Sequence, residues 1–352
     1  MTAEETVGSA GGTEPEVGME DGVETGAEVC VEVLLDQSAW STHLAEETRS
    51  GLLADPPWIP PVWFYDETGS ALFDEITRLE EYYPTRTERS ILTECADEVA
   101  RITGAQTLAE LGSGTSDKTA LLLDALGQWG TLERFAPFDC SEEVLREAAG
   151  SISAQRPGME VHAVVGDFHD HLHGLPTDGI CLLAFLGSTI GNLDGAQRKS
   201  FLAEVADTLE ADDWFLLGTD LVKPVDRLVA AYDDPGGVTA RFNLNALSVM
   251  NDELGANFDT GGFEHRAIWN PDDSRMEMHL VSLRDQEVDI PGLRELHLRI
   301  ADGEHIRTEI SSKFTEDQVL AELAGAGLEV HSTWTDRNGD FLLSLARLAR
   351  LD

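Results

Sequence analysis

The chain has 352 residues, 42% of them hydrophobic, which is enough to bury a large core in one domain or two. Its 24 basic and 66 acidic residues give a net charge of −42, which argues against nucleic-acid binding because phosphate contacts need patches of Lys and Arg. No apolar run approaches the ~20 residues that cross a membrane, and no secretory signal is recognisable. We therefore predict a cytoplasmic protein without membrane contact.

The acidic residues are spread along the chain. Residues 1–50 carry twelve acids and one arginine, a charge of −11, which leaves −31 on the rest. This spread favours adaptation to a salty, halophile-like cytoplasm, where ions screen self-repulsion, over binding to one basic partner. Only four lysines occur, at positions 118, 199, 223 and 313. The four cysteines, at 30, 95, 140 and 181, lack zinc-site spacing, so we predict reduced thiols and no metal.

The amino-terminal third divides into two parts. Residues 1–35 are rich in Gly, Glu, Thr and Val, which predicts a disordered acidic extension, with a partner-bound helix as the alternative. Residues 36–100 are aromatic, and Leu72, Phe73 and Ile76 recur at helical spacing. We interpret this part as the helical beginning of a substrate domain.

Strands and helices alternate in residues 101–222, which predicts an α/β fold with a doubly wound, parallel, Rossmann-like sheet. We expect strands at 108–111, 134–139, 161–167, 179–186 and 214–220, and helices at 115–126, from 142 onward, and at 196–209.

The alternation stops in residues 223–305. Helices at 226–232 and 239–254 and hairpin strands at 264–269 and 275–283 predict an insertion that joins the amino-terminal part in a second, α+β substrate-binding domain. Residues 306–352 are expected to complete the sheet and the substrate site. They hold a strand at 306–312, a helix at 315–326 and a last edge strand at 341–346.

A two-glycine turn follows the first core strand, in Glu110-Leu-Gly-Ser-Gly-Thr-Ser116. Gly112 and Gly114 lack Cβ, so a ligand can approach the backbone there, and Thr115 or Ser116 can cap the next helix. A dinucleotide fingerprint needs a third glycine three residues after Gly114 and a partner for the pyrophosphate. Asp117 occupies that position, and only Lys118 is basic. S-adenosylmethionine, which has no phosphate, therefore suits the turn better than a nicotinamide dinucleotide.

Acidic residues close the neighbouring strands. Ligands of open parallel sheets bind beyond the carboxyl ends of the strands. Asp139 is placed to bind the two ribose hydroxyls of S-adenosylmethionine, and Asp167 with Phe168 to bind and stack on its adenine.

Six collinear motifs extend from about residue 50 toward the carboxyl terminus. They are Ile59-Pro-Pro-x-Trp-Phe-Tyr-Asp-x-x-Gly-Ser70, Glu81-Tyr-Tyr-Pro-Thr-Arg86, Glu110-Leu-Gly-Ser-Gly-Thr-Ser116, Phe185-Leu-Gly-Ser-Thr-Ile-Gly-Asn192, Gly218-Thr-Asp-Leu-Val-Lys223 and Ala231-Tyr-Asp-Asp-Pro-Gly-Gly-Val-Thr239. In these motifs the chain resembles the histidine Nα-methyltransferases of ergothioneine biosynthesis, and the similarity runs to the carboxyl terminus. This resemblance implies an S-adenosylmethionine-binding methyltransferase core that passes three methyl groups to the α-amino group of L-histidine, giving hercynine.

The resemblance also implies roles for individual residues. The implied cofactor-binding residues are Gly112, Lys118, Asp139, Asp167 and Phe168, beside Gly114 of the same turn. The implied substrate-binding residues are Tyr82, Asn192 and Tyr232 at the amino acid end, Glu309 and Ser311 at the imidazole, and Met278 as an apolar contact. Tyr65 is implied near the reacting amine, where it orients rather than acts as a firm base.

Two alternatives stay open at this point. One is a methyltransferase that acts on another amino acid, such as tryptophan. The other is a non-catalytic relative that only binds S-adenosylmethionine. Glu309 and Ser311 favour histidine, since a buried pair of polar groups rejects side chains that cannot satisfy both. We expect the protein to act on this small molecule as a monomer.

Overall fold

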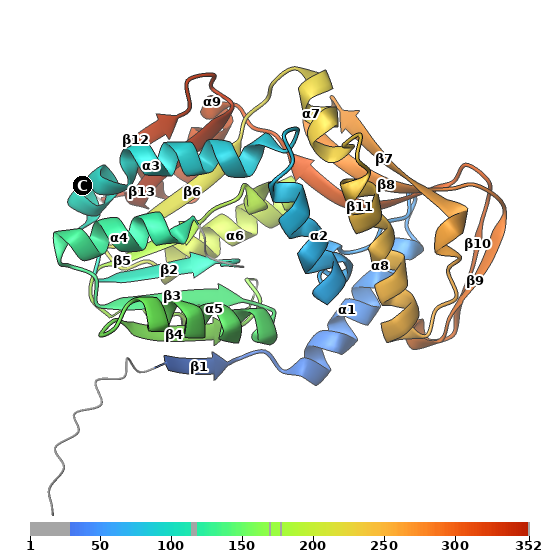
Figure 1. Ribbon diagram of the computed structural model, residues 1–352, viewed down its shortest axis with the longest axis horizontal. Helices are drawn as coiled ribbons and strands as arrows, with labels where there is room; N and C mark the ends of the chain where they lie inside the picture. Colours follow the sequence, from blue (N-terminus) through green and yellow to red (C-terminus); the bar gives the residue numbers. More distant parts are fainter. Residues whose placement is uncertain (1–28, 114–117, 169, 177, 351–352) are drawn as a thin grey trace, which may run out of the picture.

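The computed structural model describes residues 29–113, 118–168, 170–176 and 178–350, and it confirms an α/β fold built on a central sheet. The eight strands of the sheet lie in the order β1-β4-β3-β2-β5-β6-β13-β12 (Figure 1). They are β1 (Val29–Val33), β2 (Thr107–Leu111), β3 (Arg134–Asp139), β4 (Glu160–Val165), β5 (Cys181–Phe185), β6 (Trp214–Asp220), β12 (Leu328–Thr335) and β13 (Phe341–Leu348).

The sheet is mixed rather than wholly parallel. Strands β1 to β6 pair in parallel, whereas β13 runs antiparallel to β6 and β12 runs antiparallel to β13. The expectation that 341–346 forms the edge strand is wrong, because β12 covers it. The burial of β13 and β12 explains why β13 lies inside the sheet and β12 at its edge. β13 is buried at six consecutive positions, as an interior strand should be, while β12 alternates between buried or half-buried and exposed residues.

The amino-terminal extension is shorter than predicted. Residues 29–33, expected to be disordered, form β1, which pairs with β4 from Val29↔Val161 to Val33↔Val165. Three valines at every second position suit an extended strand, and Val31 packs against the core. Residues 1–28 of the predicted extension lie outside the described residues.

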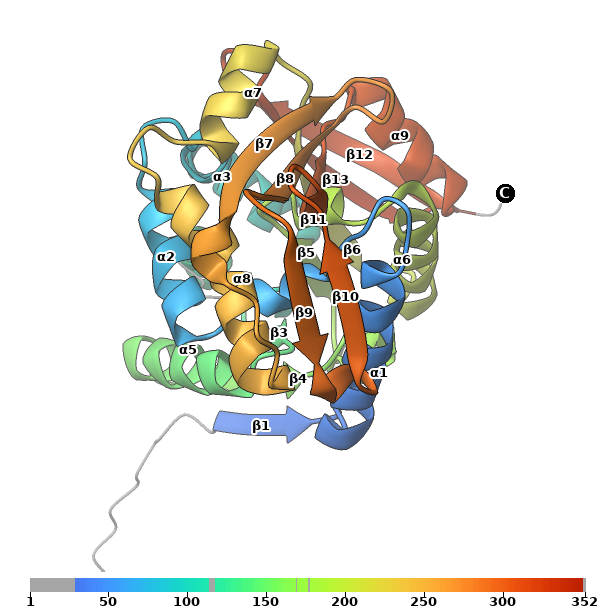
Figure 2. The same ribbon diagram turned by 90° about the vertical axis from the view of Figure 1, so that its right-hand side faces the viewer.

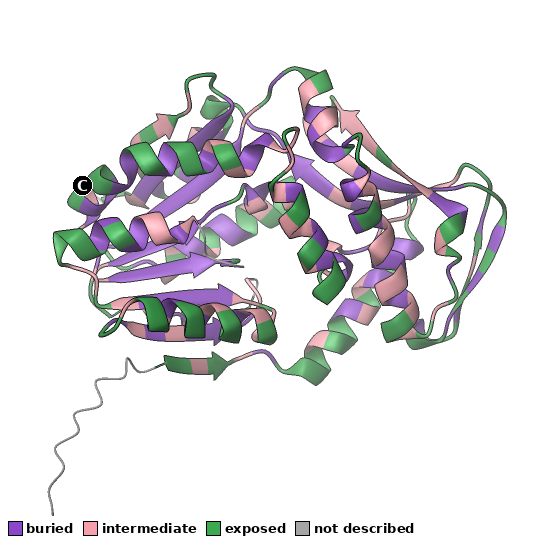
Figure 3. Ribbon diagram, in the orientation of Figure 1, coloured by how far each residue is buried: buried purple, intermediate pink, exposed green. Residues whose placement is uncertain are grey.

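Helices cover both faces of the sheet, and the strands carry the buried core between them (Figure 3). All five residues of β5 are buried, as the continuous apolar run predicts for a central strand. One face packs against α3 (Tyr83–Thr103), α4 (Thr119–Trp129) and α5 (Glu142–Gln155), and the other against α6 (Gly195–Thr208) and α9 (Glu316–Gly325).

A second hydrophobic core lies beyond the carboxyl ends of the central strands, at the right of Figure 1 and facing the viewer in Figure 2. It is built from two chain segments, residues 44–83 and 228–306. Its elements are the helices α1 (Gln37–Leu52), α2 (Glu67–Thr77), α7 (Val225–Tyr232) and α8 (Val238–Leu254), a three-stranded sheet of β7 (Phe263–Asn270), β8 (Arg275–Ser282) and β11 (His305–Ser312), and a pair, β9 (Gln286–Ile290) and β10 (Leu296–Ile300). The short 3-10 helices are η1 (Pro61–Phe64), η2 (Leu172–Gly174), η3 (Thr189–Asn192), η4 (Thr260–Gly262) and η5 (Pro291–Leu293).

Backbone hydrogen bonds join these segments to each other and to the central sheet. Ile59 donates to the carbonyl of Arg307, and Arg307 donates to the carbonyl of Pro57, both at 2.9 Å. Phe314, just beyond β11, donates to the carbonyl of Asp220 at 2.9 Å. The second core is therefore fixed against the carboxyl end of β6, where ligands of such sheets bind.

Candidate active site

The predicted cofactor residues lie at three neighbouring strand ends. The N–H of Gly112, after β2, donates to the carbonyl of Phe138 in β3 at 2.8 Å. The N–H of Gly166, after β4, donates to the carbonyl of Asp139 at 3.0 Å, so Asp139 and Asp167 follow adjacent strands. Gly112 has φ +65°, a left-handed conformation that favours glycine. Gly114, Thr115 and Ser116 lie outside the described residues.

Phe168 has an aromatic environment of its own. Its ring stacks on Phe138 at a centroid distance of 5.6 Å and meets the ring of Phe185 edge-on at 5.5 Å. A Cβ at position 112 would lie 3.6 Å from this ring. Phe168 thus borders the glycine turn, and its predicted stacking on adenine stays a prediction.

Lys118 pairs with a buried carboxylate. Its ammonium contacts Glu88 of α3, and Glu88 also accepts the N–H of Gly187 at 2.8 Å. Lys118 thereby connects the end of the glycine turn to the loop after β5. Burial raises the pKa of nearby Glu110 to about 8, against the opposing charge of Lys118.

The predicted substrate residues come together in a single cleft between the central sheet and the second core. Sequence positions from all parts of the chain contribute, because η1, α3, η3, α7, β8 and β11 all border the space. The predicted residues that line it are Tyr65, Tyr82, Asn192, Tyr232, Met278, Glu309 and Ser311.

Aromatic rings form one wall of the cleft. The ring of Phe73 lies 6.1 Å from that of Tyr65 and 6.3 Å from that of Tyr82, and Tyr82 lies 6.5 Å from Tyr232. The ring of Phe242, in α8, also belongs to this wall, and its centroid lies 5.8 Å from that of Tyr65. Phe73 and Phe242 have no predicted role. The helical spacing of Phe73 predicts a core residue, and the same spacing allows a side chain at the edge of the core.

Glu309 is the acidic group of the cleft. Its Oε1 accepts a hydrogen bond from the Asn192 side chain at 3.0 Å. Burial raises the pKa of Glu309 to about 7, against the opposing charge of Lys313 and the hydrogen bond from Asn192. The structure thus joins a residue implied at the amino acid end of the substrate to one implied at its ring.

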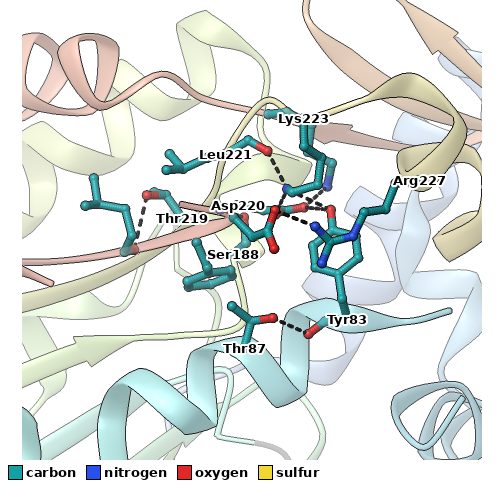
Figure 4. A network of polar contacts seen from close by, with 12 residues as sticks. Tyr83, Thr87, Ser188, Thr219, Asp220, Leu221, Lys223 and Arg227 are labelled. Atoms are coloured by element: carbon teal, nitrogen blue, oxygen red, sulfur yellow. Dashed lines mark hydrogen bonds and ion pairs between the residues drawn. The ribbon is translucent and has the colours of Figure 1, made fainter. Parts of the chain in front are cut away.

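A network of buried charges surrounds Asp220, at the end of β6 (Figure 4), and borders the cleft through Asp220 and Lys313. Asp220 accepts from the Tyr83 hydroxyl at 2.7 Å and from the ammonium groups of Lys223 at 2.5 Å and Lys313 at 2.8 Å. Burial alone would raise the pKa of Asp220, but the two lysines outweigh it and hold the pKa below its ordinary value. The Asp220 N–H donates to Ser188 Oγ at 2.9 Å, which fixes the loop that carries Asn192.

A model of the family described as histidine-specific, S-adenosylmethionine-dependent methyltransferases matches residues 44–348. The chain belongs to this family. It is 54% identical over 303 residues to the histidine N-alpha-methyltransferase of Mycolicibacterium smegmatis, covering 86% of this chain and 94% of that protein. It is 51% identical over 312 residues to the enzyme of the same name from Mycobacterium tuberculosis, covering 89% and 97%. Ergothioneine biosynthesis protein 1 of Neurospora crassa is 32% identical over 305 residues, which cover 84% of this chain and 34% of that protein.

As a member of the histidine-specific methyltransferase family, the chain uses S-adenosylmethionine as its methyl donor. The described strand ends fit this donor. Gly112 is exposed with an open left-handed turn, and Asp139 is half-buried at the adjacent strand end, where it also accepts the Ser141 N–H at 3.0 Å. Among the described residues no cluster of His, Cys, Asp and Glu could hold a metal, and no described helix is long and apolar enough to cross a membrane.

Several buried residues in or beside the cleft have no role predicted from the sequence. Lys223 and Lys313 fell within or beside recognised segments but received no role, and Tyr83 and Glu88 were not singled out. A usable signal was present. In a chain with four lysines, three are held by buried carboxylates in the structure, and only Lys199 is exposed. In a strongly acidic sequence with few lysines, each lysine is therefore a candidate partner of a buried carboxylate.

Proposed function

We propose that this chain transfers three methyl groups from S-adenosylmethionine to the α-amino group of L-histidine, giving hercynine in the first step of ergothioneine biosynthesis. The observation that carries the proposal is the position of Glu309 and Ser311, which line one cleft with the aromatic wall beyond the carboxyl ends of the strands. A carboxylate and a hydroxyl suit the two nitrogens of an imidazole. The names of the two mycobacterial relatives support the same substrate.

The chemistry requires alignment more than acid–base catalysis. When bound, S-adenosylmethionine supplies an electrophilic methyl carbon, and its sulfur keeps the electron pair of the broken bond as S-adenosylhomocysteine forms. The cleft residues must hold the neutral amine so that its lone pair points along the line of that bond. Each transfer then forms one C–N bond, and a proton leaves the nitrogen to water before the next transfer.

We assign the orientation of the amine to the tyrosines of the aromatic wall. Tyr65 lies at the cleft mouth with 50% of its surface exposed. Desolvation of its hydroxyl and the negative charges of Glu309 and Asp139 raise its pKa above the ordinary value. Tyr65 is therefore a protonated phenol at neutral pH, suited to orient the amine and not to remove its proton.

The same wall suits the product. Aromatic faces attract a cation by about 0.5–2 kcal/mol, and methylation turns the nitrogen into a permanent cation without N–H donors. Tyr65, Tyr82 and Tyr232 can thus stabilise each successive product without a fixed hydrogen bond that methylation would break.

The proposal is tested by incubating the purified protein with L-histidine and S-adenosylmethionine over a range of salt concentrations. We expect histidine to gain three methyl groups by mass spectrometry. If no methylated histidine forms at any salt concentration, the proposal fails.

A substrate panel separates the two remaining alternatives. Preferred methylation of tryptophan or another amino acid would replace histidine as the substrate. Calorimetric binding of S-adenosylmethionine with no turnover of any panel member would indicate a non-catalytic relative.

We also propose that the enzyme acts as a monomer in the cytoplasm. The four cysteines are free thiols, which supports a reducing compartment. Light scattering coupled to size-exclusion chromatography measures the molar mass at low and high salt and so tests whether the protein is a monomer.

A further inference from the structure

Lys313, just beyond β11, has all of its hydrogen-bonding capacity committed inside the protein. Its side chain is 1% exposed. The ammonium contacts Asp220 Oδ2 at 2.8 Å, the Tyr232 hydroxyl at 2.7 Å and Ser311 Oγ at 2.8 Å. An ammonium group has three N–H donors and no acceptor. Each of its hydrogens therefore has one partner, and their directions are fixed.

The direction of the next hydrogen bond follows from this arrangement. A phenol oxygen accepts one strong hydrogen bond, because its second lone pair is conjugated with the ring, and Lys313 supplies that bond to Tyr232. Tyr232 must then donate its own hydrogen, and Ser311 Oγ lies 2.8 Å away. Ser311 Oγ thus accepts from both Tyr232 and Lys313, which occupies both of its acceptor positions.

The hydroxyl hydrogen of Ser311 is left for a ligand. Ser311 lines the cleft, and within the described part of the chain its only hydrogen bonds are the two that it accepts and those of its backbone. Glu309, two residues earlier on β11, also lines the cleft and presents a carboxylate acceptor. The site therefore offers one donor and one acceptor side by side.

We propose that Lys313, anchored by Asp220, is a positioning residue that fixes Ser311 as a hydrogen-bond donor and so restricts the site to rings with one N–H and one unprotonated nitrogen. Neutral imidazole satisfies both groups. A protonated imidazole, or a ring with an N–H but no acceptor nitrogen, leaves the Ser311 hydrogen without a partner. This inference rests on the proposed histidine substrate and extends it to a residue whose ammonium group is engaged by Asp220, Tyr232 and Ser311.

The test uses binding of L-histidine and of the two pyrrolylalanine isomers, each of which keeps one ring N–H and replaces the other nitrogen by C–H. Affinities are measured by calorimetry with the protein saturated with S-adenosylhomocysteine. We expect the wild type to bind histidine about tenfold to hundredfold more tightly than the better isomer, because a buried donor without an acceptor is costly. Lys313→Met and, separately, Tyr232→Phe should each reduce the ratio of the two affinities about tenfold. Each variant frees an acceptor position on Ser311 Oγ, which can then accept a hydrogen bond from a ring N–H.

Lys223→Met is the matched control. Lys223 is 2% exposed and also binds Asp220, at 2.5 Å, but its hydrogen bonds go to Asp220, Tyr83 and the Leu221 carbonyl rather than to Ser311. This variant removes a similar buried charge and should keep the wild-type preference. The proposal is overturned if the preference persists in both Lys313→Met and Tyr232→Phe, or if Lys223→Met loses it equally. A wild type that binds histidine without preferring it over the pyrroles overturns this inference alone, whereas one that neither binds nor methylates histidine overturns the proposed function.

Discussion

Asn192 Nδ2 donates a hydrogen bond to Glu309 Oε1 at 3.0 Å, across 117 positions of the sequence. One partner lies in η3, above the carboxyl end of β5, and the other in β11 of the second core. The orientation of the Glu309 carboxylate, which we propose to bind the imidazole, therefore depends on the loop that follows a central strand. The geometry of the cleft is a joint property of the two halves of the protein.

Glu309→Gln is expected to weaken histidine binding about tenfold while leaving the affinity for S-adenosylhomocysteine unchanged. The amide keeps the shape of the side chain but removes its negative charge. A charged acceptor makes a hydrogen bond stronger by about 1 kcal/mol or more than a neutral one does. Isothermal titration calorimetry measures both affinities. An equal loss of the two would indicate misfolding and contradict a specific role for Glu309.

Histidine binding should release a proton near pH 7. Burial raises the pKa of Glu309 to about 7 in the free protein, and an imidazole N–H is accepted best by the ionised carboxylate. Binding therefore lowers this pKa and expels a proton, and affinity rises as the pH increases through about 7. Calorimetry in buffers of different ionisation enthalpy counts the protons. Glu309→Gln should release fewer protons than the wild type, and an equal number in the variant would assign the release to other groups.

Glu88→Gln should destabilise the fold by about 3 kcal/mol, because it leaves Lys118 without its buried ionic partner. It should also weaken cofactor binding, since Glu88 joins the end of the glycine turn to Gly187. Urea unfolding and calorimetry measure the two effects. The control is Asp74→Asn, which removes an exposed ion pair with Arg78 and should cost less than about 1 kcal/mol. Equal costs for the two variants would contradict a structural role for Glu88.

Gly191→Ala should impair turnover of histidine. A Cβ at position 191 would lie 2.9 Å from the carbonyl oxygen of Ser312 and 3.2 Å from its nitrogen, so η3 must move away from β11. We expect a loss of about 1–3 kcal/mol in unfolding free energy and a drop of about tenfold in kcat/KM.

Gly195→Ala provides the comparison, because the nearest atom to its Cβ would be 3.9 Å away, on Arg198. Its kcat/KM and Tm should match those of the wild type. A Gly191→Ala variant that also behaves as wild type would show that η3 tolerates displacement.

The melting temperature should rise with salt. A net charge of −42 makes the folded protein repel itself, and the screening length falls from about 10 Å at 0.1 M salt to about 3 Å at 1 M. Thermal unfolding followed across that range of KCl measures the effect, with an uncharged osmolyte as the control. A melting temperature independent of KCl would contradict the predicted adaptation to salt.

The central strands could be predicted because a buried strand appears in the sequence as a continuous apolar run. The run from Gly179 to Leu186 predicts a buried strand, and β5 occupies its centre. The order of β12 and β13 could not be read in the same way. Half of the residues of β12 are exposed to solvent, so its sequence carries only a weak apolar pattern. The buried strand β13 needs a second neighbour in the sheet, and no local pattern shows that β12 is that neighbour.

The residues that line the cleft could be predicted to the extent that the resemblance to the family implied them. All seven residues implied at the substrate line the observed cleft. The connections between them were not predictable. Tyr83 and Asp220, or Lys313 and Tyr232, are far apart in sequence, and only the docking of the second core on β6 brings each pair within hydrogen-bonding distance.

The distribution of lysine has a practical consequence for chemical labelling. The side chains of Lys223 and Lys313 are 2% and 1% exposed, and Lys118 is 21% exposed and paired with Glu88. Lys199, near the start of α6, is the remaining lysine and is exposed. Of the four lysines, an amine-reactive dye or surface linker will therefore attach to the folded protein mainly at Lys199. The chain already offers one exposed lysine side chain, on a helix that contributes no residue to the lining of the cleft.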